Sequence, residues 1–194
     1  MLAFSGKIGL LAVLALLVGN VEQAKGEMTF QAFMNGANVR PDPLPTLGTG
    51  LATLTLNDLE TELRFEVAFQ DLISYTTRID IHFGSPNEVG PELFLLSQGA
   101  KNSPVLGALT AGELIPQPSI GINTFEDAIL AMINNNIYME IHTPAFFNDP
   151  FFTTVEVRGQ LSPIPVPEPS TLVLLCIGSF CLLGYAWGKQ YRRQ

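Results

Sequence analysis

Apolar and polar residues alternate along several stretches of this chain. A period of two is typical of a β-strand with one face toward a core, so these stretches predict half-buried strands. The clearest are Leu63–Phe69, Thr77–Phe83, Ile137–His142 and Val155–Gln160. Shorter apolar runs between turn residues predict further strands at Thr29–Met34, Gly50–Leu56, Leu93–Ser97 and Leu106–Leu109.

One segment carries a helical period instead. Phe125, Ala128, Ile129, Met132 and Ile133 share one helix face, and Asn134-Asn-Asn136 ends the pattern. Asn123 and Glu126 have the spacing of a capping box, so we expect the helix to begin after Asn123. Seven or eight strands with alternating faces and one short helix predict an all-β antiparallel sandwich or barrel rather than a parallel sheet.

Residues 1–26 have the composition of a secretory signal peptide. Lys7 precedes an unbroken apolar run from Ile8 to Val18, and small residues follow it. Cleavage is expected after Gly26, with Ala24 as the alternative position. The run is short for a membrane span of about 30 Å, although an uncleaved N-terminal anchor is the other interpretation.

The C-terminal end has three parts. Residues 163–171 form a proline-rich linker, residues 172–188 are apolar without a charge, and residues 189–194 are basic. This order predicts a transmembrane helix with a cytoplasmic tail, which places the domain at 27–162 outside the cytoplasm.

The same segment resembles a known sorting signal. Pro167, Glu168 and Pro169, the apolar helix and the basic tail resemble the PEP-CTERM signal of bacteria with exopolysaccharide-rich envelopes. The resemblance implies that an exosortase, a membrane cysteine transpeptidase, processes the chain near this motif. A plain single-pass anchor is the alternative.

Charge and cysteine content narrow the possible partners of the domain. Residues 27–162 hold five cationic side chains against sixteen carboxylates, a formal charge of −11. Such a surface repels phosphate backbones, so nucleic acid is not an expected partner. Cys176 and Cys181 both lie in the apolar C-terminal segment, so the domain has no disulfide.

The middle of the chain resembles the chordin-type (CHRD) domain. The residues that carry the resemblance are Phe30–Gly36, Gly48–Leu56, Ile81–Gly84, Tyr138–Thr143 and Val157–Leu161. It implies an immunoglobulin-like β-sandwich without a settled biochemical activity in bacteria. Bacterial members usually carry His-Ile-His where this chain has Asp80-Ile81-His82.

Two acid-x-His pairs are the candidate metal ligands. Asp80 and His82 project from one face of their strand, and Glu140 and His142 repeat the pattern on another. If the strands are neighbours, four donors converge in a set suited to zinc or copper. The alternative is a solvated sheet face, on which Arg78 and Arg158 neutralise the carboxylates.

No other catalytic motif is present in the sequence, which lacks Gly-x-Ser-x-Gly, a phosphate loop and His-Glu-x-x-His. We therefore expect a non-enzymatic envelope or matrix module that binds exopolysaccharide or envelope proteins. A zinc or copper enzyme of dismutase-like type is the alternative, by analogy of fold alone. Four phenylalanines between residues 146 and 152 are expected to cover an open end of the sandwich, or else to form a docking patch.

Overall fold

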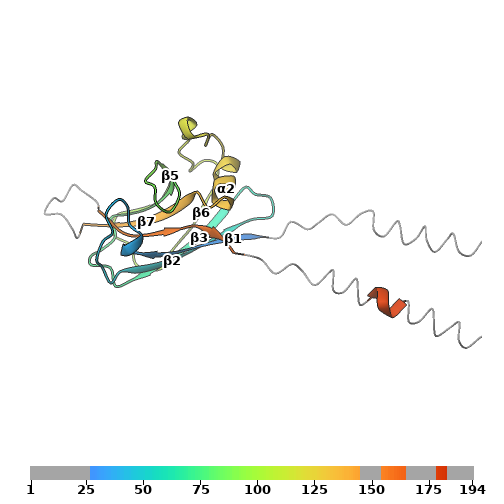
Figure 1. The fold of residues 1–194 in the computed structure, drawn as a ribbon, viewed down its shortest axis with the longest axis horizontal. Helices are drawn as coiled ribbons and strands as arrows, with labels where there is room; N and C mark the ends of the chain where they lie inside the picture. Colours follow the sequence, from blue (N-terminus) through green and yellow to red (C-terminus); the bar gives the residue numbers. More distant parts are fainter. Residues whose placement is uncertain (1–26, 145–153, 165–177, 183–194) are drawn as a thin grey trace, which may run out of the picture.

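The computed structural model describes residues 27–144, 154–164 and 178–182 (Figure 1). The predicted signal peptide, the phenylalanine cluster and the Pro-Glu-Pro motif lie outside these residues. The strands are β1 (Met28–Asn35), β2 (Thr49–Leu56), β3 (Leu63–Gln70), β4 (Arg78–Phe83), β5 (Glu92–Gln98), β6 (Val105–Leu109), β7 (Ile137–Thr143), β8 (Thr154–Gln160) and β9 (Ser162–Pro163). The helices are η1 (Gly36–Asn38), η2 (Pro118–Ile120) and α2 (Phe125–Ile133).

All eight strands predicted from the sequence are present, so the all-β expectation is confirmed. They form one antiparallel sheet in the order β5-β4-β7-β8-β1-β2-β3-β6, and β9 adds to β1. The sheet curls until its edge strands β5 and β6 approach each other, which makes it nearly closed. One nearly closed sheet is compatible both with a sandwich and with a barrel.

The core fills the inside of the curled sheet. Phe30, Leu54 and Ile81 are fully buried there, each on a different strand and each at an inward position of the alternation. Burying one such side chain contributes roughly 1.5–3 kcal/mol, so these positions are the main source of stability in a domain without disulfides. Helix α2 closes one end, where Phe125 meets Phe94 edge-on with ring centroids 6.1 Å apart.

The predicted helix cap is wrong by one residue. Thr124 has extended backbone and accepts a hydrogen bond from the Asp127 N–H, while the Asp127 carboxylate accepts from the Thr124 N–H. Asn123 donates its own N–H to the same carboxylate. Both Asn-x-x-Glu and Thr-x-x-Asp fit a capping box, and the pair that lies directly before Phe125 forms it.

The two ends of the domain lie side by side. The Ile164 N–H donates to the Thr29 carbonyl at 2.8 Å, so the chain leaves the domain where it enters (Figure 1). Within the described residues, no helix has the length and apolar character needed to cross a membrane. The predicted membrane helix at 172–188 lies outside them, apart from the helical residues 178–182.

Candidate metal centre

Strands β4 and β7 are neighbours, which brings the two acid-x-His pairs together. Asp80 lies directly opposite Glu140, and His142 lies opposite Arg78 in the same ladder. Because side chains two apart on a strand share a face, Asp80, His82, Glu140 and His142 all project from one face. The strand adjacency that the metal hypothesis required is therefore present.

The four side chains converge on one point. One donor atom of each lies within 4.8 Å of those of the other three. Asp80 Oδ1 is 3.2 Å from His142 Nε2 and 3.4 Å from His82 Nε2. Glu140 Oε2 is 3.8 Å from His142 Nε2 and 3.9 Å from His82 Nε2. Both imidazoles thus face both carboxylates through Nε2.

This face is not solvated at the centre. The side chains of Asp80 and Glu140 are 1% and 6% exposed, and those of His142 and His82 are 12% and 17% exposed. The alternative of a solvated sheet face is therefore wrong for these strands. Residues 84–91 form part of the cover, because their backbone contacts the side chains of His82, Tyr138 and Arg158.

The orientation of His82 is fixed from outside the centre. Its Nδ1 lies 2.9 Å from the Gly90 carbonyl oxygen. Because a carbonyl oxygen only accepts hydrogen bonds, Nδ1 carries the proton, and Nε2 of the neutral ring carries the free lone pair. The ring stacks on Tyr138 with centroids 5.3 Å apart. Tyr138 in turn accepts a hydrogen bond from the Gly90 N–H. His82 Nε2 is buried and makes no aligned hydrogen bond with the described residues.

Each carboxylate turns one oxygen toward an arginine and the other toward the histidines. Arg78 donates to Asp80 Oδ2 and to Glu92, which leaves Asp80 Oδ1 for the imidazoles. Arg158 Nη1 lies 3.8 Å from Glu140 Oε1, and its guanidinium stacks 3.5 Å above the Tyr138 ring. The arginines that were expected to neutralise the carboxylates therefore occupy their outer oxygens and leave the inner ones facing the histidines.

Burial and charge act in opposite directions on the ionisable groups. Burial opposes ionisation of Asp80, but its interactions with His142 and His82 outweigh burial and lower its pKa. Burial would lower the pKa of His82, yet the Asp80 carboxylate and the Gly90 carbonyl raise it. For Glu140, burial is the largest effect and raises its pKa, although the two histidines act in the opposite direction. These shifts favour an ionised Asp80 and a protonated His82.

Three residues around the centre were not identified from the sequence as parts of it. Tyr138 and Gly90 orient His82, and Glu156 on β8 is a third buried carboxylate in addition to Asp80 and Glu140. The alternation puts Tyr138 and Glu156 on the side of their strands that faces away from the core, where burial is not expected. No local pattern marks Gly90, because its role depends on a tertiary contact.

The structure thus defines a β domain with a buried charged centre under its loops. Comparison with protein families identifies it more closely: the CHRD domain model matches residues 30–161, so the chain belongs to the CHRD domain family. A model of the PEP-CTERM protein-sorting motif matches residues 165–193, which implies export and sorting by an exosortase. No curated protein and no solved structure matches the chain.

Proposed function

We infer that this protein is a non-catalytic module of the cell envelope or extracellular matrix, retained there through its C-terminal sorting motif. The observation that carries this inference is the order of the two matches, since only three residues separate the end of the CHRD domain from the start of the sorting motif. Exosortase is its processing partner. The sorting motif leads to a membrane or surface location, with the domain outside the cytoplasm.

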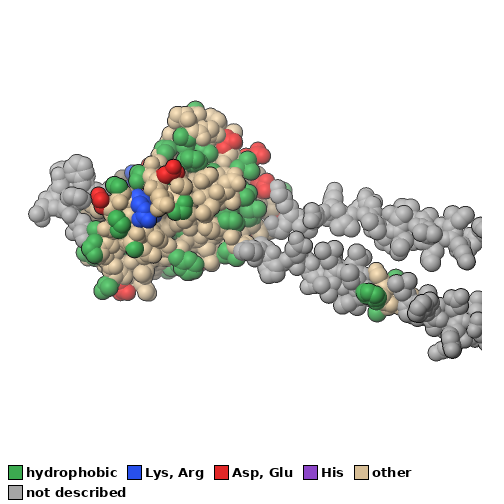
Figure 2. All heavy atoms as spheres, viewed as in Figure 1, with side chains coloured by type: hydrophobic (Ala, Val, Ile, Leu, Met, Phe, Trp, Pro, Cys, Tyr) green, Lys and Arg blue, Asp and Glu red, His purple; other side chains and the backbone are tan. Residues whose placement is uncertain are grey.

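The geometry of the domain ends supports a display role. Thr29 and Ile164 are hydrogen-bonded at one end of the domain, so a single attachment point leaves the remaining surface free. That surface is acidic, and Figure 2 shows carboxylates gathered near the end that carries α2. Envelope proteins and exopolysaccharide are the partners this location offers, and phosphate-rich nucleic acid is disfavoured by charge.

The candidate centre supports binding rather than catalysis. Catalytic zinc sites use three protein ligands and keep one position for water, whereas this centre has four protein donors facing one point. The hydrogen-bond partners of the two imidazoles among the described residues are Asp80 and Gly90, so neither histidine is paired with a hydroxyl or thiol that it could activate as a nucleophile. A closed ligand set of this kind is typical of a structural site.

Sorting is tested by comparing three chains in cell fractions. The wild type is expected at the membrane or surface in a shortened, processed form. The triple variant Pro167→Ala, Glu168→Ala, Pro169→Ala keeps the apolar segment and should remain unprocessed. A chain ending at Ile164 keeps the β9 pairing with β1 and should be released to the medium. Identical size and distribution of all three would contradict the proposal.

A metal-dependent enzyme of dismutase-like type is the second candidate, and the convergence of two histidines and two carboxylates is the observation that favours it. The full chain loaded with copper decides between the two. Superoxide dismutation that is lost in His82→Gln would replace the non-catalytic proposal, and no dismutation leaves the enzyme candidate without support.

A further inference from the structure

We propose that Asp80, His82, Glu140 and His142 bind one zinc ion through Asp80 Oδ1, His82 Nε2, Glu140 Oε2 and His142 Nε2. Zinc bonds to imidazole nitrogen and carboxylate oxygen at about 2.0–2.2 Å, which places tetrahedral ligand atoms about 3.3–3.6 Å from one another. The four histidine–carboxylate distances range from 3.2 to 3.9 Å. The other two pairs of donor atoms also lie within 4.8 Å of each other, so the four side chains need only close together around the ion to bind it.

The orientation of His82 requires a metal ion or a proton at Nε2, independently of these distances. His82 Nδ1 donates to Gly90, so the buried Nε2 of the neutral ring faces Asp80 Oδ1 with lone pair against lone pair. Such an arrangement needs a cation or a proton between the two atoms. Metal-binding histidines commonly donate their other ring N–H to a backbone carbonyl, and this contact holds Nε2 in the direction of the centre.

The two carboxylates are also held in place by contacts from outside the centre, as His82 is. Arg78 fixes the outer oxygen of Asp80, and Arg158 lies beside the outer oxygen of Glu140. Each inner oxygen is thereby held in place as a single-atom ligand. Asp80, Glu140 and Glu92 outnumber the two guanidiniums, so the group carries a residual negative charge when the histidines are neutral.

The donor types decide the class of ion. Calcium and magnesium take six or more oxygen ligands, many of them water, and this buried centre offers two oxygens and two nitrogens. Imidazole with carboxylate in a four-coordinate arrangement suits zinc. Among the described residues, no cysteine belongs to the group of donors that converge at this centre.

Zinc titration of the metal-stripped full chain tests the proposal. We expect one zinc per chain and a midpoint of thermal unfolding that rises with zinc concentration, since an ion that binds only the folded state stabilises it. His82→Gln and His142→Gln should each weaken zinc affinity by about 100-fold or more, because each removes a ligand. Glu140→Gln should weaken it too. Its matched control is Glu66→Gln, which removes an exposed carboxylate on β3 and should bind zinc like the wild type.

Zinc-edge X-ray absorption of the wild-type chain gives a readout that does not depend on whether a variant folds. The expected spectrum has nitrogen and oxygen ligands only, with the imidazole signature of two histidines. The proposal is overturned if zinc does not stabilise the wild type, if the histidine variants bind as tightly as Glu66→Gln, or if sulfur ligates the ion. None of these outcomes bears on processing at the Pro-Glu-Pro motif, so the sorting proposal stands or fails separately.

Discussion

The outer surface of the sheet has two halves that share one alternating pattern but differ in burial. We call the outward residues of β4, β7 and β8 the covered half, and those of β1, β2 and β3 the open half. A single row of paired residues crosses both halves: Asp80, Glu140, Arg158, Asn35, Thr49 and Gln70. Its first three members are buried, and Thr49 and Gln70 are exposed.

Returning loops account for the difference. Arg158 Nη2 donates to the carbonyls of Ser85 and Glu88 at 3.1 and 2.6 Å, and this holds residues 84–91 over the covered half. Glu156 accepts from the Thr46 hydroxyl at 2.7 Å and so holds the loop before β2. On the open half, Phe33 is 69% exposed. Buried charges on the covered half are thus matched by the polar groups of the loops that bury them.

Replacement of Arg158 should have the largest destabilising effect on the covered half. Arg158→Ala removes the partner of the Ser85 and Glu88 carbonyls and leaves the buried Glu140 carboxylate without the nearby cation, and we expect a loss of about 3–5 kcal/mol in the free energy of unfolding. Chemical denaturation of the full chain, followed by far-UV circular dichroism, measures it. The control is Arg64→Ala on the open half, where the side chain is 77% exposed beside Glu62. If the two variants are equally stable, the distinction between the halves fails.

A substitution at Glu156 tests whether the loop before β2 is also held in place by hydrogen bonds to a buried charged side chain. Its Oε1 accepts from the Thr46 hydroxyl and the Ile73 N–H, and its Oε2 accepts from the Thr143 hydroxyl at 2.8 Å. Glu156→Gln keeps the shape but replaces one acceptor with a donor, so we expect a loss of about 1–3 kcal/mol in the free energy of unfolding.

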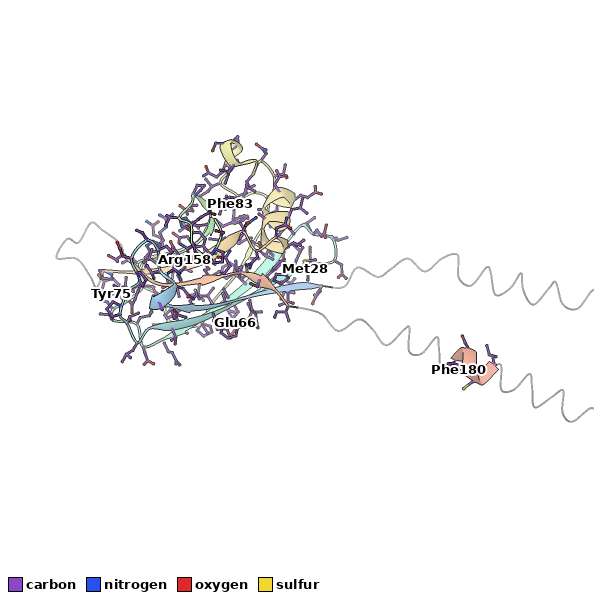
Figure 3. The ribbon with its side chains drawn as sticks, viewed as in Figure 1. Met28, Glu66, Tyr75, Phe83, Arg158 and Phe180 are labelled. Carbon is purple, nitrogen blue, oxygen red and sulfur yellow. The ribbon has the colours of Figure 1, made fainter. Side chains whose placement is uncertain are left out.

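The matched control for Glu156→Gln is Glu66→Gln, which makes the same chemical change on the open half. Figure 3 shows Glu66 at the surface of the domain and Arg158 within it. The control should unfold like the wild type in the same denaturation experiment. A neutral Glu156→Gln would mean that its three contacts contribute nothing to the cover.

Strand positions could be predicted from the sequence because they depend on local alternation. In β4 the alternation also indicates correctly which residues face the core: Ile79 and Ile81 do, and Asp80 faces the other way. The alternation, however, does not determine whether the outward face meets water. Residue type does not separate the halves either, since Arg64 and Glu66 on β3 are charged and exposed while Asp80 and Glu140 are charged and buried.

The candidate centre shows the same division between local and tertiary information. The acid-x-His spacing identified all four side chains and their common face, because that is a property of one strand at a time. Whether β4 and β7 pair depends on a connection of more than fifty residues, which the pattern does not specify. The Gly90 carbonyl that orients His82 comes from a loop eight residues away, where nothing in the sequence marks a contact.

The open half gives the smallest expected effect and the sharpest test of its exposure. Phe33 lies directly opposite Leu51 in the β1–β2 ladder, and both side chains are exposed. Phe33→Thr keeps a residue that favours strands and removes one cross-strand apolar contact, which is worth about 0.2–1 kcal/mol. The denaturation midpoint of the full chain should therefore shift only slightly. A loss above about 2 kcal/mol is the size expected for a buried aromatic side chain, and it would show that another part of the molecule covers this face as well.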